Sequence, residues 1–146
     1  MKKTISYRGT LAMGLEDRIR LRTIKGKVGY KISKFQLLSS TPGVNIQEFV
    51  GKITKVTDPN IGPVVNFTDS DMMACAVQST HSGNLLLTET VIFDNEITNQ
   101  DIFVNITDGA GGTVPCNYYI ELEVVDLSDI ETTQITLKSL RTVTSR

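Results

Sequence analysis

Apolar and polar side chains alternate along much of this chain, and this alternation constrains the fold more than any other feature. In residues 18–22, Arg18, Arg20 and Arg22 alternate with Ile19 and Leu21. Neighbouring residues on a β-strand point to opposite faces, so the arginines would share one face and the apolar side chains the other. The abundant Thr, Ile and Val residues also fit pleated sheet better than helix. The sequence therefore predicts a chain built mainly of strands.

Turn-forming residues divide the chain into short candidate strands. Clusters of Pro, Gly, Asn, Asp and Ser separate the strands at 41–43, 58–60, 82–84, 94–95 and 108–109. The candidate strands span 4–7, 18–22, 29–38, 49–56, 85–93, 101–106, 118–126 and 133–143. Such spacing indicates a sandwich or a closed antiparallel barrel. We expect an all-β, antiparallel, jelly-roll-like β-sandwich as a single domain over 1–146.

Two alternating stretches late in the chain predict a β-hairpin. Residues 101–106 and 117–126 flank the glycine-rich stretch 108–112, whose residues tolerate positive φ. Alternation also predicts which side chains point inward from these strands and from 18–22. The predicted inward set is Ile19, Leu21, Ile102, Val104, Ile106, Tyr118, Ile120, Leu122 and Val124.

At most one or two short helices are expected. The best candidate is 69–78, where early acids and a Met- and Ala-rich run suit a short helix packed on the sheet. Residues 133–143 show weak helical spacing, but their Thr, Ile and Val content favours an extended chain. We therefore predict a strand there.

The two cysteines, the amino terminus and the distribution of apolar residues indicate in which compartment the protein is made. Cys75 and Cys116 match no zinc or redox motif and are expected to be small buried hydrophobes. The opening MKKTISYRGT has no apolar region after its lysines, so no signal peptide is predicted. No apolar run approaches the ~20 residues that span a bilayer, so no membrane is expected. We therefore expect the protein to be made and to fold first in a cytoplasm.

Candidate catalytic and metal-binding residues are sparse. His81, the only histidine, lies in a polar stretch that predicts a solvated loop, and no serine lies in a nucleophile elbow. Asp94, Asn95 and Glu96 gather oxygen ligands of the kind Ca²⁺ prefers, but Asx-rich turns form such clusters routinely. We predict no catalysis, no metal and no cofactor, and leave ion binding at 94–96 open.

Charge is distributed unevenly along the chain. The first 55 residues hold twelve basic and three acidic residues, a net +9, whereas the rest hold three basic and thirteen acidic residues, a net −10. This asymmetry indicates an electrostatic partner, either an acidic external surface or the acidic part of another copy. The candidate docking residues are Arg18, Arg20, Arg22, Lys25 and Lys27. Cations on edge strands can instead serve only to block edge-to-edge pairing, and this alternative stays open. An acidic protein surface is favoured over nucleic acid, because few aromatic side chains interleave with these cations.

Three stretches carry a family resemblance: KTISYRGT at 3–10, TVIFDNEITNQDIFV at 90–104 and CNYYIELE at 116–123. In these stretches the chain resembles the small all-β virion proteins encoded by tailed phages, particularly marine ones. The resemblance implies a capsid decoration (cement) or accessory structural role in many copies. It implies the major capsid protein or other virion proteins as partners. It carries no functional residues over to this chain.

Charge and resemblance together predict a non-enzymatic structural protein of the virion. We expect it to associate with other copies and to dock through its basic amino-terminal region, which could act as an arm. The first alternative is a carbohydrate-binding β-sandwich module, for which Tyr30, Tyr118 and Tyr119 are the aromatic candidates. The second is a small enzyme, which would require His81 in a pocket beside a carboxylate.

Overall fold

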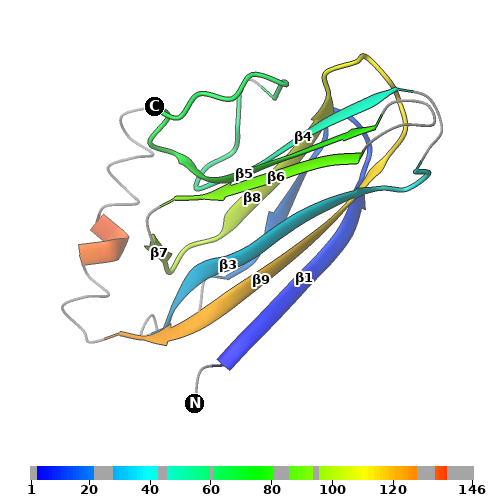
Figure 1. Ribbon diagram of the computed structural model, residues 1–146. Coiled ribbons are helices and arrows are strands. Elements are labelled where there is room, and N and C mark those ends of the chain that lie inside the picture. The colour runs from blue at the N-terminus through cyan, green and yellow to red at the C-terminus, as the bar shows by residue number, and fades with distance from the viewer. Residues whose placement is uncertain are drawn as a thin grey trace.

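The chain folds into two antiparallel sheets packed face to face (Figure 1). The computed structural model describes residues 3–21, 28–42, 46–59, 61–80, 86–93, 96–127 and 134–137. Within these residues there are nine strands and a single helical turn, at 134–137. The strands are β1 (Lys3–Leu11), β2 (Glu16–Ile19), β3 (Val28–Ser39), β4 (Gln47–Thr54), β5 (Met72–Thr80), β6 (Leu86–Ile92), β7 (Ile97–Thr98), β8 (Ile102–Asp108) and β9 (Cys116–Asp126). The predicted all-β sandwich is confirmed.

Strand pairing follows a nested order. The four-stranded sheet has the order β1-β9-β3-β7, and the five-stranded sheet has the order β2-β8-β4-β5-β6. Early strands therefore pair with late ones: β1 with β9, β2 with β8, and β3 with β7, while β4 pairs with β5 at the centre of the sequence. This is the arrangement of a jelly roll, with β6 added at one edge.

The core lies between the sheets and has the composition that alternation predicted. Every predicted inward side chain except Val124 is less than a tenth exposed, and Val124 is partly buried against the core. The prediction of these inward faces is confirmed. Ile102, Val104 and Ile106 come from β8, and Ile120 and Leu122 come from β9, so both sheets contribute fully buried aliphatic side chains.

The predicted helix at 69–78 is wrong. Residues 72–78 belong to β5, which lies between β4 and β6 in the five-stranded sheet, and residues 69–71 precede this strand. Both faces of the first half of β5 are buried, which replaces the expected alternation with a continuous apolar run. Such a run cannot be told from a buried helix by periodicity alone. On the neighbouring strand β4, Lys52 Nζ donates a hydrogen bond of 2.8 Å to the carbonyl of Val64, which lies between β4 and β5 in the sequence.

The predicted hairpin of 101–106 with 117–126 is also wrong. Strand β8 pairs with β2 and β4, whereas β9 pairs with β1 and β3, so the two strands lie in different sheets. The glycine-rich connection, with Gly111 at φ 80°, passes from one sheet to the other. Glycine permits a chain reversal but does not decide which strand supplies the hydrogen bonds.

The predicted strand at 133–143 is wrong where the structure describes it. Residues 134–137 form a helical turn, and the remainder of that segment lies outside the described residues. The turn is tied to the sandwich by a hydrogen bond of 2.8 Å from Asn99 Nδ2 to Thr136 Oγ1. Tertiary contacts of this kind override a weak local preference for extended chain.

Candidate functional site

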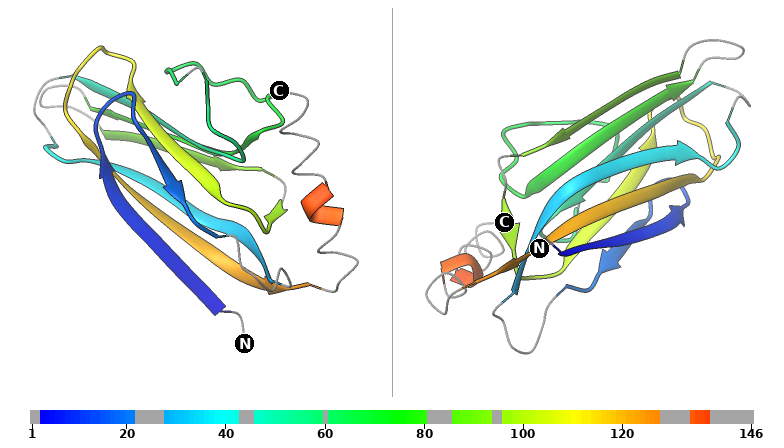
Figure 2. Two further views of the ribbon diagram at one scale, coloured as in Figure 1. Left: turned by 180° about the vertical axis from the view of Figure 1, so that it is seen from behind. Right: turned by 60° about the horizontal axis from the view of Figure 1, so that its bottom comes forward.

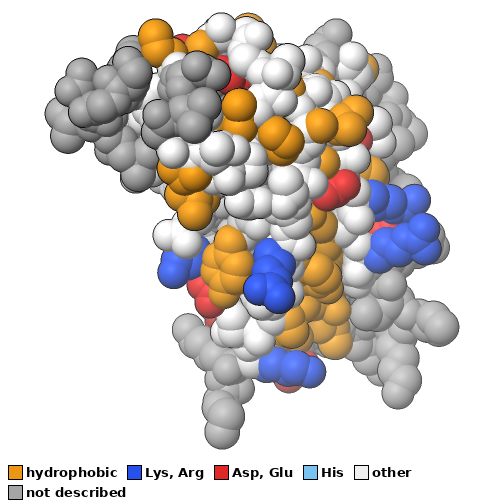
Figure 3. Space-filling model, turned by 90° about the vertical axis from the view of Figure 1, so that its right-hand side faces the viewer, with side chains coloured by type: hydrophobic (Ala, Val, Ile, Leu, Met, Phe, Trp, Pro, Cys, Tyr) orange, Lys and Arg blue, Asp and Glu red, His pale blue; other side chains and the backbone are white. Residues whose placement is uncertain are grey.

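Two edge strands form one open side of the sandwich. Strand β1 ends the four-stranded sheet and β2 ends the five-stranded sheet, and the two lie side by side in both views of Figure 2. We call this the β1–β2 side. Lys3, Arg8, Arg18 and Arg20 are exposed on its strands or directly after them. β1 runs along the face drawn in Figure 3, where Lys and Arg side chains flank a stripe of hydrophobic side chains.

Arg18 is held by its own chain. Its Nε and Nη2 atoms lie 2.7 and 2.6 Å from Asp101 Oδ2, and its guanidinium carbon lies 6.0 Å from the ring centroid of Phe103. The second carboxylate oxygen of Asp101 accepts a hydrogen bond of 2.9 Å from the amide of Leu21. This arrangement fixes the edge of the five-stranded sheet and leaves the Arg18 side chain 57% exposed.

Of the other predicted docking residues, Arg20 is the one that the described part of the chain includes. Arg20 is exposed and forms no ion pair with another described residue, and the same holds for Lys3 and Arg8. Arg22, Lys25 and Lys27 lie outside the described residues. Lys3 and Arg8 lie outside the dense cluster of cations at 18–27 from which the docking residues are predicted, so the sequence gives no local signal for them.

The charge asymmetry of the sequence has a counterpart in the ion pairs of the fold. Four ion pairs join two described residues, and each links a cation from the first 55 residues to an acid from the rest. They are Arg18 with Asp101, Lys34 with Glu121, Lys52 with Asp58, and Lys55 with Glu96. Nested pairing brings early strands against late ones, so part of the asymmetry is used inside the molecule.

Acidic side chains near the β1–β2 side also bind within the chain. Glu16 Oε2 accepts a hydrogen bond of 3.0 Å from the amide of Asp58. Asp17 Oδ2 accepts one of 2.9 Å from the hydroxyl of Tyr118, which joins β2 to β9 across the two sheets. Burial, followed by this hydrogen bond to Asp17, raises the pKa of Tyr118. The acids of this side are therefore engaged inward, whereas Lys3, Arg8 and Arg20 face solvent.

The remaining candidate residues for chemistry are dispersed. Glu96 pairs with Lys55 rather than with other carboxylates, while Asp94, Asn95 and His81 lie outside the described residues. Among the residues that the structure describes, no three His, Cys, Asp or Glu side chains are grouped to hold a metal ion.

Both cysteines are buried and free, as the sequence predicted. Burial raises the pKa of the Cys75 thiol, and it raises that of Cys116 to about 12. A thiol with such a pKa stays protonated at neutral pH and is a poor nucleophile. Their role is therefore in packing.

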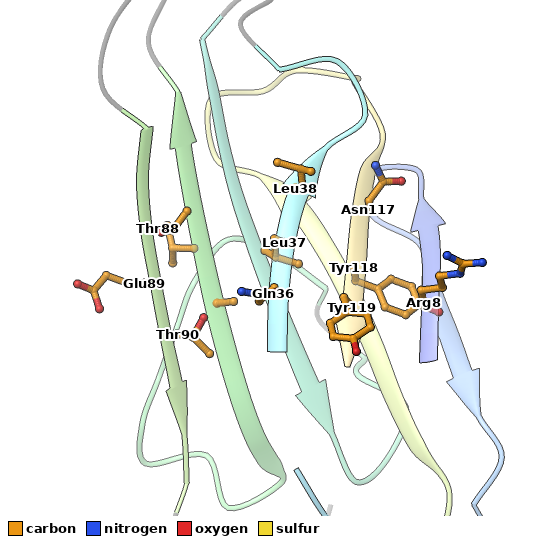
Figure 4. Close-up of a pocket in the computed structure, with 12 residues that line it drawn as sticks. Arg8, Gln36, Leu37, Leu38, Thr88, Glu89, Thr90, Asn117, Tyr118 and Tyr119 are labelled. Atoms are coloured by element: carbon orange, nitrogen blue, oxygen red, sulfur yellow. The ribbon is translucent and has the colours of Figure 1, made fainter. Parts of the chain in front are cut away.

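A pocket of about 520 Å³ lies beside β3 and β6, in the region we call the β3–β6 side, and its lining extends across β9 to Arg8 of β1 (Figure 4). Strand β9 pairs with β3 along one edge, but β7 pairs only with Tyr30 and Lys31 on the other edge, so no described strand covers that second edge along the second half of β3. The inner face of β6 is exposed there, and a hydrogen bond of 3.0 Å from Thr90 Oγ1 to the carbonyl of Phe35 bridges the sheets. Side chains with hydroxyl, amide or charged groups line much of the pocket: Arg8, Gln36, Thr88, Thr90, Asn117 and Tyr119.

Register places three of these lining residues in one row. Arg8 is opposite Tyr119, and Tyr119 is opposite Gln36, across β1, β9 and β3. Sequence alternation predicted that Tyr119 faces away from the core, but the row depends on long-range register and had no local signal. Tyr30 and Tyr118 are 9% and 7% exposed, so Tyr119 alone of the three candidate aromatics is available as a platform.

No protein-family model matches the chain, and no curated protein or solved structure does so either. In the part of the chain that the structure describes, no helix combines the length and apolar character needed to cross a membrane.

Proposed function

We propose that the chain is a structural protein of a tailed-phage virion that binds the capsid surface as a decoration, cement or accessory protein. The jelly-roll order supports this proposal, because viral capsid proteins use that fold, although lectins and cupins use it too. The observation that carries the proposal is the state of the charges on the β1–β2 side. Lys3, Arg8 and Arg20 are exposed and form no ion pair with another residue of the described ranges, while Asp17 and Asp101 bind groups of their own chain.

The proposed mechanism is docking on an acidic protein surface. Exposed cations steer the chain toward carboxylates, and the arginine fork can bind a carboxylate through two hydrogen bonds. Partly buried apolar side chains of β1, such as Ile5 and Tyr7, supply surface that the contact can cover. The partner is the major capsid protein or another virion protein, and further copies of the chain occupy equivalent positions on the particle.

The test compares binding to the purified particle across a salt series. Replacing Lys3, Arg8 and Arg20 with Gln should weaken binding by about tenfold at low salt and flatten the salt dependence. Arg18→Gln is the matched control, because Arg18 already binds Asp101 and should contribute less to docking. The wild-type chain should also co-purify with the particle in stoichiometric amounts. Equal affinity and an equal salt slope for the wild type and triple variant would contradict the proposal.

A carbohydrate-binding module is the second candidate, favoured by the pocket and by the row of Arg8, Tyr119 and Gln36. Oligosaccharide titrations followed by tyrosine fluorescence would test it, since the chain has no Trp. Loss of binding in Tyr119→Ala, with particle binding unchanged, would favour this candidate over the virion protein.

A further inference from the structure

Strand β6 is an edge strand with little protection against pairing. It ends the five-stranded sheet, and no other described strand lies beside its outer edge. Its sequence, LLTETVI, contains no Lys or Pro and carries a single charge, at Glu89. Soluble proteins usually protect such an edge with lysine, proline or a bulge, because open backbone groups are a template for another strand.

The backbone groups at this edge can be assigned from the pairing with β5. The amide of Phe93 donates a hydrogen bond of 3.0 Å to the carbonyl of Met73, so the backbone groups of Phe93 point toward β5. These directions alternate along an antiparallel strand, and the register of β6 has no shift. The amides and carbonyls of Thr88, Thr90 and Ile92 therefore point away from β5, to the open edge.

The side chains of β6 define what an added strand would meet. Leu87 and Val91 are 58% and 37% exposed on the outer face, and Glu89 lies between them. Thr88, Glu89 and Thr90 all contribute to the lining of the pocket beside β3, and Figure 4 shows the Glu89 side chain directed to the opposite side of β6 from those of Thr88 and Thr90. Cross-strand neighbours on one face contact each other most closely. A complementary strand would thus have apolar side chains opposite Leu87 and Val91 and a cation opposite Glu89.

A second copy of the chain does not meet this requirement. Two β6 strands related by a twofold axis would pair antiparallel, and the register that matches Leu87 with Val91 sets Glu89 opposite its own equivalent. Like charges placed directly opposite destabilise a strand pair. Shifting the register by two residues sets Glu89 opposite Leu87 or Val91 instead. No twofold register among these supplies a cation.

We propose that β6 binds an extended segment of a partner protein by strand addition. The segment has a Lys or Arg opposite Glu89 and apolar residues two positions to either side. Its backbone pairs with Thr88, Thr90 and Ile92, and its alternate side chains enter the pocket beside β3. In this binding mode main-chain hydrogen bonds supply affinity and alternate side chains supply specificity.

The experiment uses the full chain and two synthetic peptides. One probe is acetyl-Thr-Val-Thr-Lys-Thr-Val-Thr-amide, and the other has Glu in place of the central Lys. We expect the Lys probe to bind about tenfold more tightly, because it pairs opposite charges where the Glu probe sets like charges together. Hydrogen exchange should slow at the amides of Thr88 and Thr90 when the Lys probe binds.

Two variants test the geometry. Thr88→Pro removes an amide at the open edge, where proline is tolerated, so it should abolish binding and leave the fold intact. Glu89→Lys should reverse the preference between the probes, and it keeps the test valid if Thr88→Pro does not fold. Equal binding of both probes, protection outside β6, or self-association of the wild-type chain through β6 would each overturn the proposal. The test needs no particle, so its result is independent of the proposed virion role.

Discussion

The two open sides of the sandwich protect their edge strands differently. On the β1–β2 side, Lys3 and Arg8 lie on β1, and Arg18 lies on β2. Cations on an edge discourage pairing with another strand, so this side suits contact through charged side chains. On the β3–β6 side, β6 exposes Leu87 and Val91 and has one carboxylate. That side suits contact through the backbone, so one sandwich offers two surfaces with different chemistry.

The sides also differ in how the sheets are joined. On the β1–β2 side, the hydroxyl of Tyr118 donates to a carboxylate, that of Asp17. On the β3–β6 side, Thr90 Oγ1 donates to the carbonyl of Phe35, and Gln78 Oε1 accepts a hydrogen bond of 2.8 Å from the amide of Ser39. Hydrogen bonds to charged groups are roughly twice as strong as neutral ones. We therefore expect the hydrogen bond of Tyr118 to Asp17 to hold the two sheets together more strongly than either neutral hydrogen bond on the β3–β6 side.

The largest predicted effect lies in the core that both sides share. Ile120 is fully buried, so Ile120→Ala removes three methyl or methylene groups and leaves a cavity. We expect a loss of about 2–5 kcal/mol in the free energy of unfolding, measured by urea denaturation. The hydrogen-bond substitutions at the two sides are expected to lower the free energy of unfolding by less than this. An unchanged denaturation midpoint would mean that β9 does not turn this face toward the core.

The bond between Tyr118 and Asp17 gives the next largest effect. Tyr118→Phe removes the hydroxyl and leaves a carboxylate without this donor, which should cost about 1.5–3 kcal/mol. Thr90→Val is the matched change on the β3–β6 side and should cost about 0.5–1.5 kcal/mol, because the lost bond is neutral. Denaturation of both variants under one set of conditions tests the comparison. A larger loss for Thr90→Val would reverse it.

Sequence alternation predicted the inward faces because burial in a sandwich repeats every two residues. Ile102, Val104 and Ile106 are examples, and all three are fully buried. Alternation could not predict strand partners. The connection 109–115 is equally suited to a hairpin and to a crossing between sheets, and β8 takes the crossing because its hydrogen bonds are made with β2 and β4.

The candidate sites were harder to predict than the core. Blocks of like charge along a sequence indicate that opposite charges attract, but they do not show whether the resulting ion pairs form within the fold or with a partner. Arg18 shows the internal use, since its acid, Asp101, is 83 residues away and is brought close by the pairing of β2 with β8. The open edge of β6 has no local signal in the sequence either, because the Met- and Ala-rich run of β5 favours a helix and does not indicate a strand between β4 and β6.

Alkaline pH should weaken the fold through Cys116. Burial raises the pKa of its thiol from 9.0 to about 12, so the unfolded chain loses this proton at a lower pH than the folded chain. The free energy of unfolding should therefore fall by up to about 1.4 kcal/mol for each pH unit between about 9 and 12, and be unaffected by this group below that range. Cys116→Ala should flatten the decline in urea denaturation from pH 8 to 11. Tyr118 titrates in the alkaline range as well, so Tyr118→Phe is measured in parallel, and an unchanged slope in Cys116→Ala would contradict the prediction.

The smallest predicted effect separates two exposed arginines that lie two residues apart in the sequence. Arg18→Gln breaks the pair with Asp101, but the Arg18 side chain is 57% exposed, so solvent screening limits the loss to roughly 0.2–1 kcal/mol. Arg20→Gln should change the free energy of unfolding by less than about 0.3 kcal/mol, because Arg20 has no ion pair with a described residue. Urea denaturation at low salt should resolve the difference, and 1 M salt should reduce it, since the screening length there is about 3 Å. Particle binding should rank the variants in the opposite order, with Arg20→Gln the more affected. If Arg20→Gln destabilised the fold as much as Arg18→Gln, Arg20 would belong to the internal charge pairing, and the docking surface of the β1–β2 side would be reduced to Lys3 and Arg8.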